Sequence, residues 1–254
     1  MALPVFVINR PQDAQRLAAF QASAASVGIQ AQVIRAVDGH DPDFPAGRYA
    51  DLIGPHFWGS DQAKPGALGC FLSHRLAWET ILNQGLEAAL ICEDDAAFQG
   101  GVDLLNGADG ADLVFANGRM AAWSQAVGGA RDLPQVVAGL ARFGGPKALG
   151  IKPSPGADCY LVTAAGAGRL LDWTARLRII CGVDWAMVLG ALGPLPPGAS
   201  DAFPELGLLE ASAPENIEIS AIILPASLAD QAGTGGSTIR HSVTVPLSQL
   251  VARR

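Results

Sequence analysis

The stretch LEAALICEDDAAF, residues 86–98, places three carboxylates in a row directly after an apolar run that is typical of a buried strand. Only 16% of the chain is charged, so such a cluster stands out against the composition. Neighbouring carboxylates about 5 Å apart repel by about 3 kcal/mol at an effective dielectric constant near 20. We therefore expect Glu93, Asp94 and Asp95 to lie beside a group that offsets this repulsion.

Two interpretations account for the three acids. In the first, Asp94 or Asp95 caps a following helix, where free backbone amides and the helix dipole favour a carboxylate. In the second, the carboxylates bind a hard divalent cation, because Mg²⁺ and Mn²⁺ prefer carboxylate oxygens and fill their remaining positions with water and substrate phosphates. The local sequence leaves both interpretations open.

Apolar periodicity divides the chain into alternating strands and helices. The predicted strands are residues 4–9, 29–37, 88–92, 111–117 and 157–163, and the predicted helices are residues 12–27, 65–85 and 164–177. Residues 38–64 are rich in Gly, Pro, Asp and aromatic side chains, which predicts a long ordered loop near a ligand. Residues 123–152 show no regular pattern and are expected to form an irregular loop or a small lobe.

The opening order of strand, helix and strand is typical of parallel sheets with right-handed crossovers. The sequence therefore predicts one α/β domain over residues 1–254, with a mostly parallel central sheet flanked by helices. In such sheets ligands bind beyond the carboxyl ends of the strands, where the triplet lies. Asn9 and Asp38 each end an apolar strand on the same side, although turn formation explains these two residues almost as well.

Composition excludes several classes of function. The formal net charge of −7 and the absence of a long Lys/Arg run argue against nucleic acid as a partner. The apolar runs are shorter than the roughly 20 residues that a bilayer requires, and the N-terminus resembles a strand rather than a signal peptide. The four cysteines lie far apart without zinc spacing, which favours free thiols in a reducing cytosol.

Two other folds that place their functional residues directly after a strand are rejected. A response-regulator receiver begins with its acid-bearing strand and needs an aspartate at the end of a later one, whereas about 85 residues precede this triplet and the candidate later strand ends in Ala116 and Asn117. A dinucleotide dehydrogenase needs GxGxxG after the first strand, where this chain has NRPQD.

The pattern GCFLSHRLAWE followed by ALICEDDAAF resembles glycosyltransferase family 25, the bacterial lipooligosaccharide galactosyltransferases. Further matches follow in the family's order: VFVIN, AVDG at 36–39, DLVF at 112–115, GADCYLVTAAGAGRLL at 156–171 and VDW at 183–185. The chain departs from the family at its start, where the usual Asn-Leu and basic residues appear as Asn9-Arg10-Pro11-Gln12. That departure bears on nucleotide recognition.

The resemblance implies a GT-A-like nucleotide-sugar-binding fold, a UDP-sugar donor, a divalent metal (Mn²⁺ or Mg²⁺) and transfer with inversion at the anomeric carbon. It implies that Asp95 binds the metal directly, that Asp94 binds it directly or through water, and that Glu93 contacts the donor ribose or sugar. Residues at the donor site would further include Ser73 and His74, and Arg16 would correspond to the family's arginine. Two of these residues also have a structural explanation. His74 could be a helix histidine packed near the sheet, and Arg16 could be a solvated helix arginine.

For inverting transfer, a carboxylate must take the proton of the attacking hydroxyl. We assign this general base to Asp184, which matches the family's VDW position, and an N-cap role is its alternative; Asp158 and Asp201 are lesser candidates. Near the C-terminus, GTGGSTIRHS offers flexible glycines and two functional side chains. By analogy with GT-A enzymes, His241 is a candidate third metal ligand and Arg240 a candidate for the diphosphate.

These observations predict a cytoplasmic, metal-dependent, inverting glycosyltransferase that moves a hexose, galactose in the first instance, to a glycan or lipid-linked glycan such as lipooligosaccharide core. Peripheral membrane association is left open, although no strongly basic amphipathic helix that would hold the protein on an anionic membrane is evident. The alternative from another class is a noncatalytic nucleotide-sugar-binding protein of the same fold. A metal-dependent phosphohydrolase is a third interpretation, and it would release phosphate from simple esters.

Overall fold

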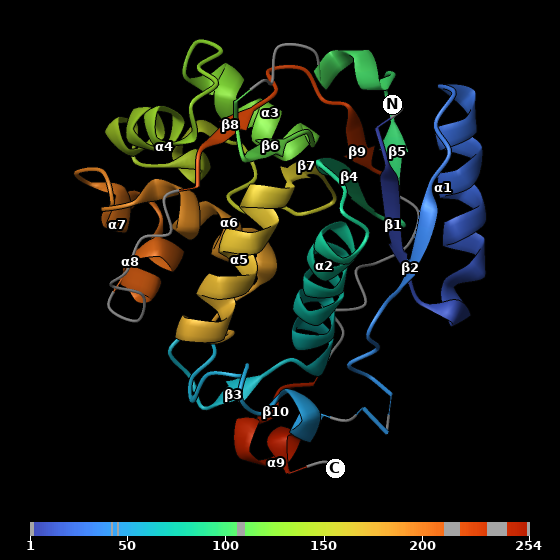
Figure 1. Ribbon diagram of the computed structural model, residues 1–254. Coiled ribbons are helices and arrows are strands. Elements are labelled where there is room, and N and C mark those ends of the chain that lie inside the picture. Colours follow the sequence, from blue (N-terminus) through green and yellow to red (C-terminus); the bar gives the residue numbers. More distant parts are fainter. Residues whose placement is uncertain are drawn as a thin grey trace.

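The computed structural model describes residues 3–41, 43–44, 46–105, 110–210, 219–232 and 243–252. It shows a mixed α/β fold with a six-stranded sheet in the order β2-β1-β4-β7-β6-β8, flanked by helices (Figure 1), which confirms the predicted fold class. The strands are β1 Val5–Asn9, β2 Gln32–Arg35, β3 Gln62–Ala63, β4 Ala88–Glu93, β5 Ala96–Phe98, β6 Leu113–Phe115, β7 Cys159–Thr163, β8 Ala221–Ile223, β9 Ala229–Gln231 and β10 Val245–Pro246.

One strand of the six runs against the others. β1 is parallel to β2 and β4, and β6 is parallel to β8, whereas β7 is antiparallel to both of its neighbours, β4 and β6. The start of β7 therefore lies at the same edge of the sheet as the end of β4. Glu93 N–H donates to the carbonyl oxygen of Asp158 across this edge at 3.0 Å.

Helices cover both faces of the sheet. They are α1 Ala14–Ser26, α2 Pro65–Asn83, α3 Gly118–Ala126, α4 Leu133–Arg142, α5 Ala164–Leu177, α6 Val183–Leu192, α7 Ala199–Ala202, α8 Pro204–Glu210 and α9 Leu247–Val251, with 3-10 turns at Pro11–Asp13, Ala46–Tyr49, Val102–Leu105 and Pro146–Leu149. In Figure 1, α2 and α5 lie side by side on one face, and α1 lies on the other side of β1.

The alternation of side chains along β1 creates the two cores. Phe6 and Ile8 point into the larger core with α2 and α5, whereas Val5 and Val7 point into the smaller core with Phe20 of α1. All four strand residues are buried, as expected for a strand covered on both faces. Each fully buried side chain of this size contributes about 1.5–3 kcal/mol of hydrophobic stabilisation.

A close backbone approach places α2 against the chain that follows β2. A Cβ atom at Gly69 would lie 2.6 Å from the carbonyl oxygen of Val37, and one at Gly39 would lie 1.9 Å from that of Pro65. Only glycine fits at such distances. The first turns of α2 are thereby held against the turn that carries Asp38.

The expectation of an irregular loop over residues 123–152 was wrong. This stretch holds the end of α3 and the whole of α4, whose Leu133, Val136, Val137 and Leu140 are fully buried at helical spacing. The side chain of Asp132 caps α4 by accepting from the backbone N–H of Gln135 at 3.1 Å. The aspartate, the proline that follows it and the later Gly-Gly pair are start and stop signals that were present in the sequence.

The loop over residues 38–64 is ordered, but its aromatic side chains serve the core more than a ligand. Phe44 and Phe57 are buried in the main hydrophobic cluster, and Trp58 contacts Trp185 of α6 with ring centroids 6.4 Å apart. The loop also contains the short strand β3, which pairs with β10 near the end of the described chain.

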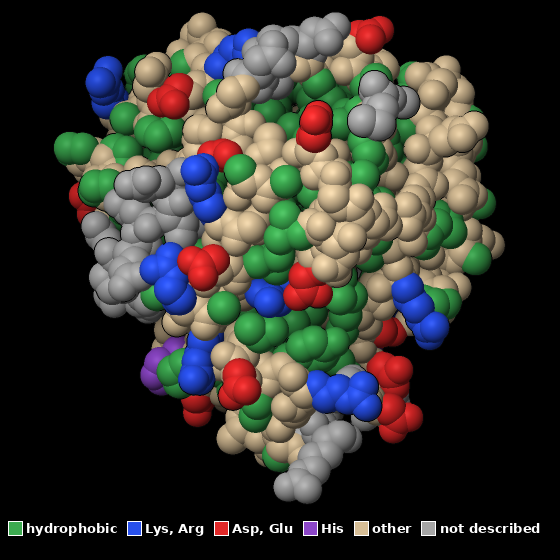
Figure 2. Space-filling view, viewed as in Figure 1, with side chains coloured by type: hydrophobic (Ala, Val, Ile, Leu, Met, Phe, Trp, Pro, Cys, Tyr) green, Lys and Arg blue, Asp and Glu red, His purple; other side chains and the backbone are tan. Residues whose placement is uncertain are grey.

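Figure 2 shows the face that carries α2 and α5, where Lys and Arg side chains alternate with carboxylates and apolar side chains. Among the residues drawn in colour on this face, neither sign of charge forms a continuous patch. Within the described ranges, every helix is too short or too polar to span a bilayer.

Candidate functional site

A pocket opens at the carboxyl ends of β1, β2 and β4. Its cavity volume is about 110 Å³, and it is open to solvent. Seven residues that the sequence singled out line it: Arg16, Asp38, Ser73, His74, Glu93, Asp94 and Asp95. Residues from 8 to 95 thus converge on one cavity, together with Gln231 from β9.

Asp94 and Asp95 share one cation, the guanidinium of Arg16. Arg16 Nη2 forms an ion pair with Asp94 Oδ1 and lies 3.2 Å from Asp95 Oδ2. Asn9 Nδ2 donates to Asp94 Oδ2 at 2.7 Å, and Gln231 Nε2 donates to Asp95 Oδ2 at 2.9 Å. The predicted counter-charge is therefore supplied, at least in part, by the chain itself.

Burial governs the protonation of this pair. It raises the pKa of Asp94 to about 6, although the hydrogen bond from Asn9 and the charge of Arg16 oppose this shift. Burial also raises the pKa of Asp95, and the charge of Glu93 adds to the increase. Asp95 Oδ1 is buried and has no hydrogen-bond partner among the described residues. One carboxylate oxygen is thus left without a proton donor or a cation.

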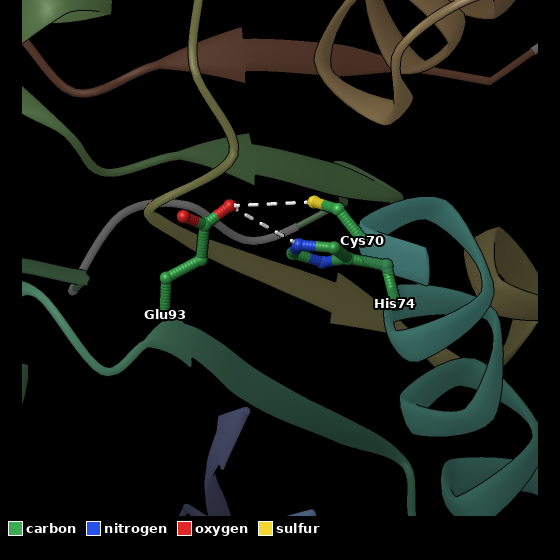
Figure 3. Close-up of side chains that lie close together, drawn as sticks. All are labelled: Cys70, His74 and Glu93. Atoms are coloured by element: carbon green, nitrogen blue, oxygen red, sulfur yellow. Dashed lines mark hydrogen bonds and ion pairs between the residues drawn. The ribbon is translucent and has the colours of Figure 1, made fainter. Parts of the chain in front are cut away.

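Glu93 is the third acid, and its surroundings differ. Figure 3 shows Cys70 and His74 projecting from α2 toward Glu93 at the end of β4. His74 Nε2 lies 3.4 Å and Cys70 Sγ 3.9 Å from the same oxygen, Oε1. Burial alone would raise the pKa of Glu93, but the hydrogen bond from His74 and the nearby arginine charges lower it below its usual value.

His74 has a second partner on its far side. Its Nδ1 lies 2.9 Å from Tyr160 Oη, and Trp78 Nε1 donates to the same oxygen at 2.9 Å. His74, Trp78 and Tyr160 are all fully buried. The histidine is therefore fixed at both ring nitrogens, between β7 and the pocket.

The turn after β2 is held by polar side chains. Asp38 accepts from Arg10 Nη1 at 3.2 Å, from the side-chain amide of Gln12 and from the backbone N–H of His40 at 3.0 Å. Ser73 Oγ accepts from Val37 N–H at 2.8 Å, so its hydroxyl positions this turn. Asn9 does not line the pocket, but it contacts it through Asp94.

Beside the pocket, the buried Asp158 forms an ion pair with the partly exposed Arg119 of α3. Burial raises the pKa of Asp158 to about 6, outweighing the opposite effect of the arginine charge. The charge of Glu93 also reaches Arg119 and raises its pKa further. Asp158 is 2% exposed, which leaves little room for a substrate hydroxyl at its carboxylate.

The structure places the remaining candidates as follows. Asp184 lies in the first turn of α6, where Gly182 is the N-cap residue, and its Oδ2 accepts from Ser154 Oγ at 3.0 Å. Asp184 does not line the pocket. Its negative charge nevertheless raises the pKa of Cys70, which lines the pocket, and of Arg119. Asp201 is exposed in α7, away from the pocket lining. Arg240 and His241 fall outside the described residues.

Two sets of side chains in this region have the chemistry of metal ligands. Asp94 and Asp95 offer the carboxylate oxygens that Mg²⁺ and Mn²⁺ prefer, and the partnerless Oδ1 of Asp95 fits a hard cation. Cys70, His74 and Glu93 offer one ligand atom each, all within 4.8 Å of one another, in a set that would suit a softer ion. The first set fits the predicted cofactor.

Sequence reasoning missed several residues around the pocket: Arg10, Cys70, Arg119, Tyr160 and Gln231. Arg10 lies in the segment that departs from the family pattern, so no motif pointed to it. Tyr160 sits inside a strand, where alternation predicts an ordinary core residue. Gln231 lies far along the chain and reaches the site only through the pairing of β9 with β5.

Comparison with known proteins agrees with the resemblance. The model of a family described as glycosyltransferase family 25 (LPS biosynthesis protein) matches residues 2–111. Proteins of mouse and human, both named inactive glycosyltransferase 25 family member 3, are 35% identical over 100 residues, and a rat protein named probable inactive glycosyltransferase 25 family member 3 is 34% identical. Each match covers 37% of this chain and 17% of the relative, so the chain spans less than a fifth of these relatives. The part of the chain that is similar to glycosyltransferase family 25, residues 2–111, supplies nearly all of the pocket lining.

Proposed function

We propose that this chain is a metal-dependent, inverting glycosyltransferase that transfers a hexose, galactose in the first instance, from a UDP-sugar to a glycan acceptor such as bacterial lipooligosaccharide core. The observation that supports this most is the charge of the pocket. Five carboxylates and two guanidinium groups line it, so a diphosphate would meet a net negative surface. A divalent cation would offset most of that excess negative charge, and it would be the largest single charge in such a site.

The chain's own cations would act on the donor. Arg10 and Arg16 line the pocket, and guanidinium groups bind phosphate oxygens with two parallel hydrogen bonds. Arg16 already contacts both aspartates, so its positive charge would lie between the acids and a bound diphosphate and would reduce their repulsion. Glu93 would accept hydrogen bonds from donor hydroxyls.

The metal would be held by Asp94 and Asp95. When bound, it would neutralise the negative charge that develops on the diphosphate as the glycosidic bond breaks. Asp184 would take the proton of the acceptor hydroxyl at a carboxylate oxygen, while that hydroxyl attacks the anomeric carbon and UDP leaves from the opposite face. Ser154 and the backbone N–H of Trp185 orient this carboxylate.

A donor panel tests the proposal. Purified protein is incubated with Mn²⁺, UDP-hexoses and glycan acceptors, and the products are identified by mass spectrometry. We expect transfer from one UDP-hexose, and we expect Asp184→Asn to abolish transfer while leaving UDP affinity unchanged. Asp172→Asn, a carboxylate 69% exposed on α5, is the matched control. Release of inorganic phosphate from simple esters would instead support a phosphohydrolase.

The second candidate is a noncatalytic nucleotide-sugar-binding protein. Two observations favour it: the similar mammalian proteins are named inactive, and Arg16 already pairs with the acids that would hold the metal. Under this alternative the protein binds UDP-sugars in the same pocket but releases no UDP with any donor and acceptor pair. The donor panel, read together with direct UDP binding, separates the two candidates.

A further inference from the structure

Trp78, Tyr160 and His74 form a buried row that ends at Glu93. Trp78 and His74 lie one turn apart on α2, and Tyr160 lies opposite them on β7. The distances are 2.9 Å from Trp78 Nε1 to Tyr160 Oη, 2.9 Å from Tyr160 Oη to His74 Nδ1, and 3.4 Å from His74 Nε2 to Glu93 Oε1. Because the first three side chains are 0% exposed, each polar atom in the row needs a partner within it.

For a neutral His74 ring, the chemistry of these groups fixes the direction of every hydrogen bond. An indole N–H can only donate, so Tyr160 Oη accepts from Trp78. The Tyr160 proton then has His74 Nδ1 as its acceptor, and burial, which raises the pKa of this hydroxyl, keeps the proton in place. With Nδ1 accepting, the neutral ring carries its proton on Nε2, which faces the Glu93 carboxylate.

The opposite tautomer is disfavoured at both ends. A proton on Nδ1 would make Tyr160 Oη accept twice and leave its own proton without an acceptor in the row. The bare Nε2 would then face a carboxylate oxygen 3.4 Å away, and two acceptors would oppose each other. Unsatisfied buried groups of this kind cost about 1–3 kcal/mol each.

We propose that Trp78, Tyr160 and His74 are positioning residues: a directed chain of buried hydrogen bonds that fixes the His74 tautomer and thereby holds Glu93 in one orientation. Oε1 accepts hydrogen bonds from both His74 and Cys70. Oε2 receives no hydrogen bond from the part of the chain that the structure describes, and in Figure 3 it points away from both donors. The role of Glu93 toward a ligand rests on the proposed function, whereas the hydrogen-bond chain itself does not.

The tautomer is tested first, without metal or ligand. Two-bond ¹H–¹⁵N spectra of the imidazole rings, with the His74 signals assigned by His74→Gln, report which nitrogen carries the proton. We expect Nε2 protonated and Nδ1 unprotonated in the wild type, and a changed Nδ1 shift in Tyr160→Phe. A His74 ring protonated on Nδ1 in the wild type would overturn the proposal, whether or not the protein binds a sugar nucleotide.

A double-mutant cycle then tests whether Tyr160 acts through Glu93. We expect Tyr160→Phe to weaken UDP-sugar binding about fivefold, the effect of one net hydrogen bond, and to have no effect in a Glu93→Ala background. Tyr49→Phe removes the other tyrosine hydroxyl of the chain, stacked on Phe44, and should leave affinity unchanged. An equal loss in both backgrounds would show a general structural effect and contradict the positioning role.

The same row argues against a thiophilic metal on Cys70, His74 and Glu93, because Nε2 would have to lose its proton. Titration with Co²⁺ reports thiolate ligation by a strong near-ultraviolet absorption. We expect no such band for the wild type. A band that appears in the wild type and is lost in both Cys70→Ser and His74→Gln would show that Nε2 serves as a metal ligand, and the proposed tautomer would be wrong.

Discussion

The two ends of the acidic triplet lie next to each other in sequence but are held by different chemistry. Asp94 and Asp95 face a guanidinium group and two side-chain amides, whereas Glu93 faces an imidazole and a thiol. The pKa of Asp94 and of Asp95 is raised by burial, but the pKa of Glu93 is lowered.

The difference shows that proximity to a cation does not by itself decide how a buried acid titrates. Arg16 contacts both aspartates, yet burial and the other acids outweigh its charge. Glu93 is stabilised as an anion by donors that are fixed in place. We infer that the aspartate pair is built to gain a further cation, and that Glu93 is built to remain an oriented acceptor.

The largest expected effect on transfer activity comes from removing one negative charge at the aspartate end of the triplet. Asp95→Asn keeps the shape of the side chain but removes a charge of the proposed metal site, and we expect transfer to fall about 10²–10³-fold, as when a principal electrostatic group is lost. Glu93→Gln keeps an acceptor oxygen, and the expected loss is about tenfold or less. Both are measured as kcat/KM with the cognate donor. Equal losses would show that the two ends do not differ in role.

Asp158 extends the contrast, because burial again outweighs a paired arginine. Its pKa is about 6 in the folded protein and 3.8 in the reference state, so the folded protein binds the proton more tightly. This contribution to stability is present at low pH and is lost as pH rises through about 6, by about 2–3 kcal/mol.

Denaturant unfolding of the protein at pH 5 and pH 7, with chelator present, measures about half of this loss, because the unfolded carboxyl group is already largely ionised at pH 5. Asp158→Asn keeps an oxygen to accept from Arg119 and should remove the corresponding share of the pH dependence. A variant whose stability changes with pH as steeply as the wild type would assign the effect to other groups.

A smaller effect is expected at Arg16. Its guanidinium lies on the two aspartates, so a divalent cation that binds them is repelled by it. We expect Arg16→Gln to bind Mn²⁺ about fivefold more tightly without nucleotide, the scale of a partly exposed ion pair, and to bind UDP more weakly. Arg75→Gln, which breaks a pair with Glu79 on the surface of α2, is the control for calorimetry. Unchanged Mn²⁺ affinity would place the metal away from Arg16.

Much of the pocket could be predicted because it is built from strand ends and one helix. The run before Glu93 predicted β4, and the helical spacing around His74 predicted α2; these two elements and the acids after β4 supply part of the lining, and the segments that begin at β1 and β2 supply most of the rest. The polar groups behind the lining depend on β7. Because this strand runs against its neighbours, residues before and within it, Asp158 and Tyr160, reach the site, although ligands were expected only after strands.

The irregular appearance of residues 123–152 has a different cause. The start and stop signals of α4 were readable, but its apolar face was not recognised as helical. The roles of Ser73 and His74 depend on which partner each hydrogen bond reaches, and those partners, Val37 and Tyr160, are 36 and 86 residues away along the chain. Such contacts follow from the fold and not from local sequence.

The central claim is that the aspartate pair binds a divalent cation which in turn binds the diphosphate of a sugar nucleotide. Calorimetric titration of UDP with Mn²⁺ or with chelator, into the wild type, Asp95→Asn and Asp172→Asn, tests it most directly. We predict that UDP binds the wild type and Asp172→Asn only with Mn²⁺, and that Asp95→Asn loses this binding while remaining folded. UDP affinity that is the same with chelator and in Asp95→Asn would contradict the claim.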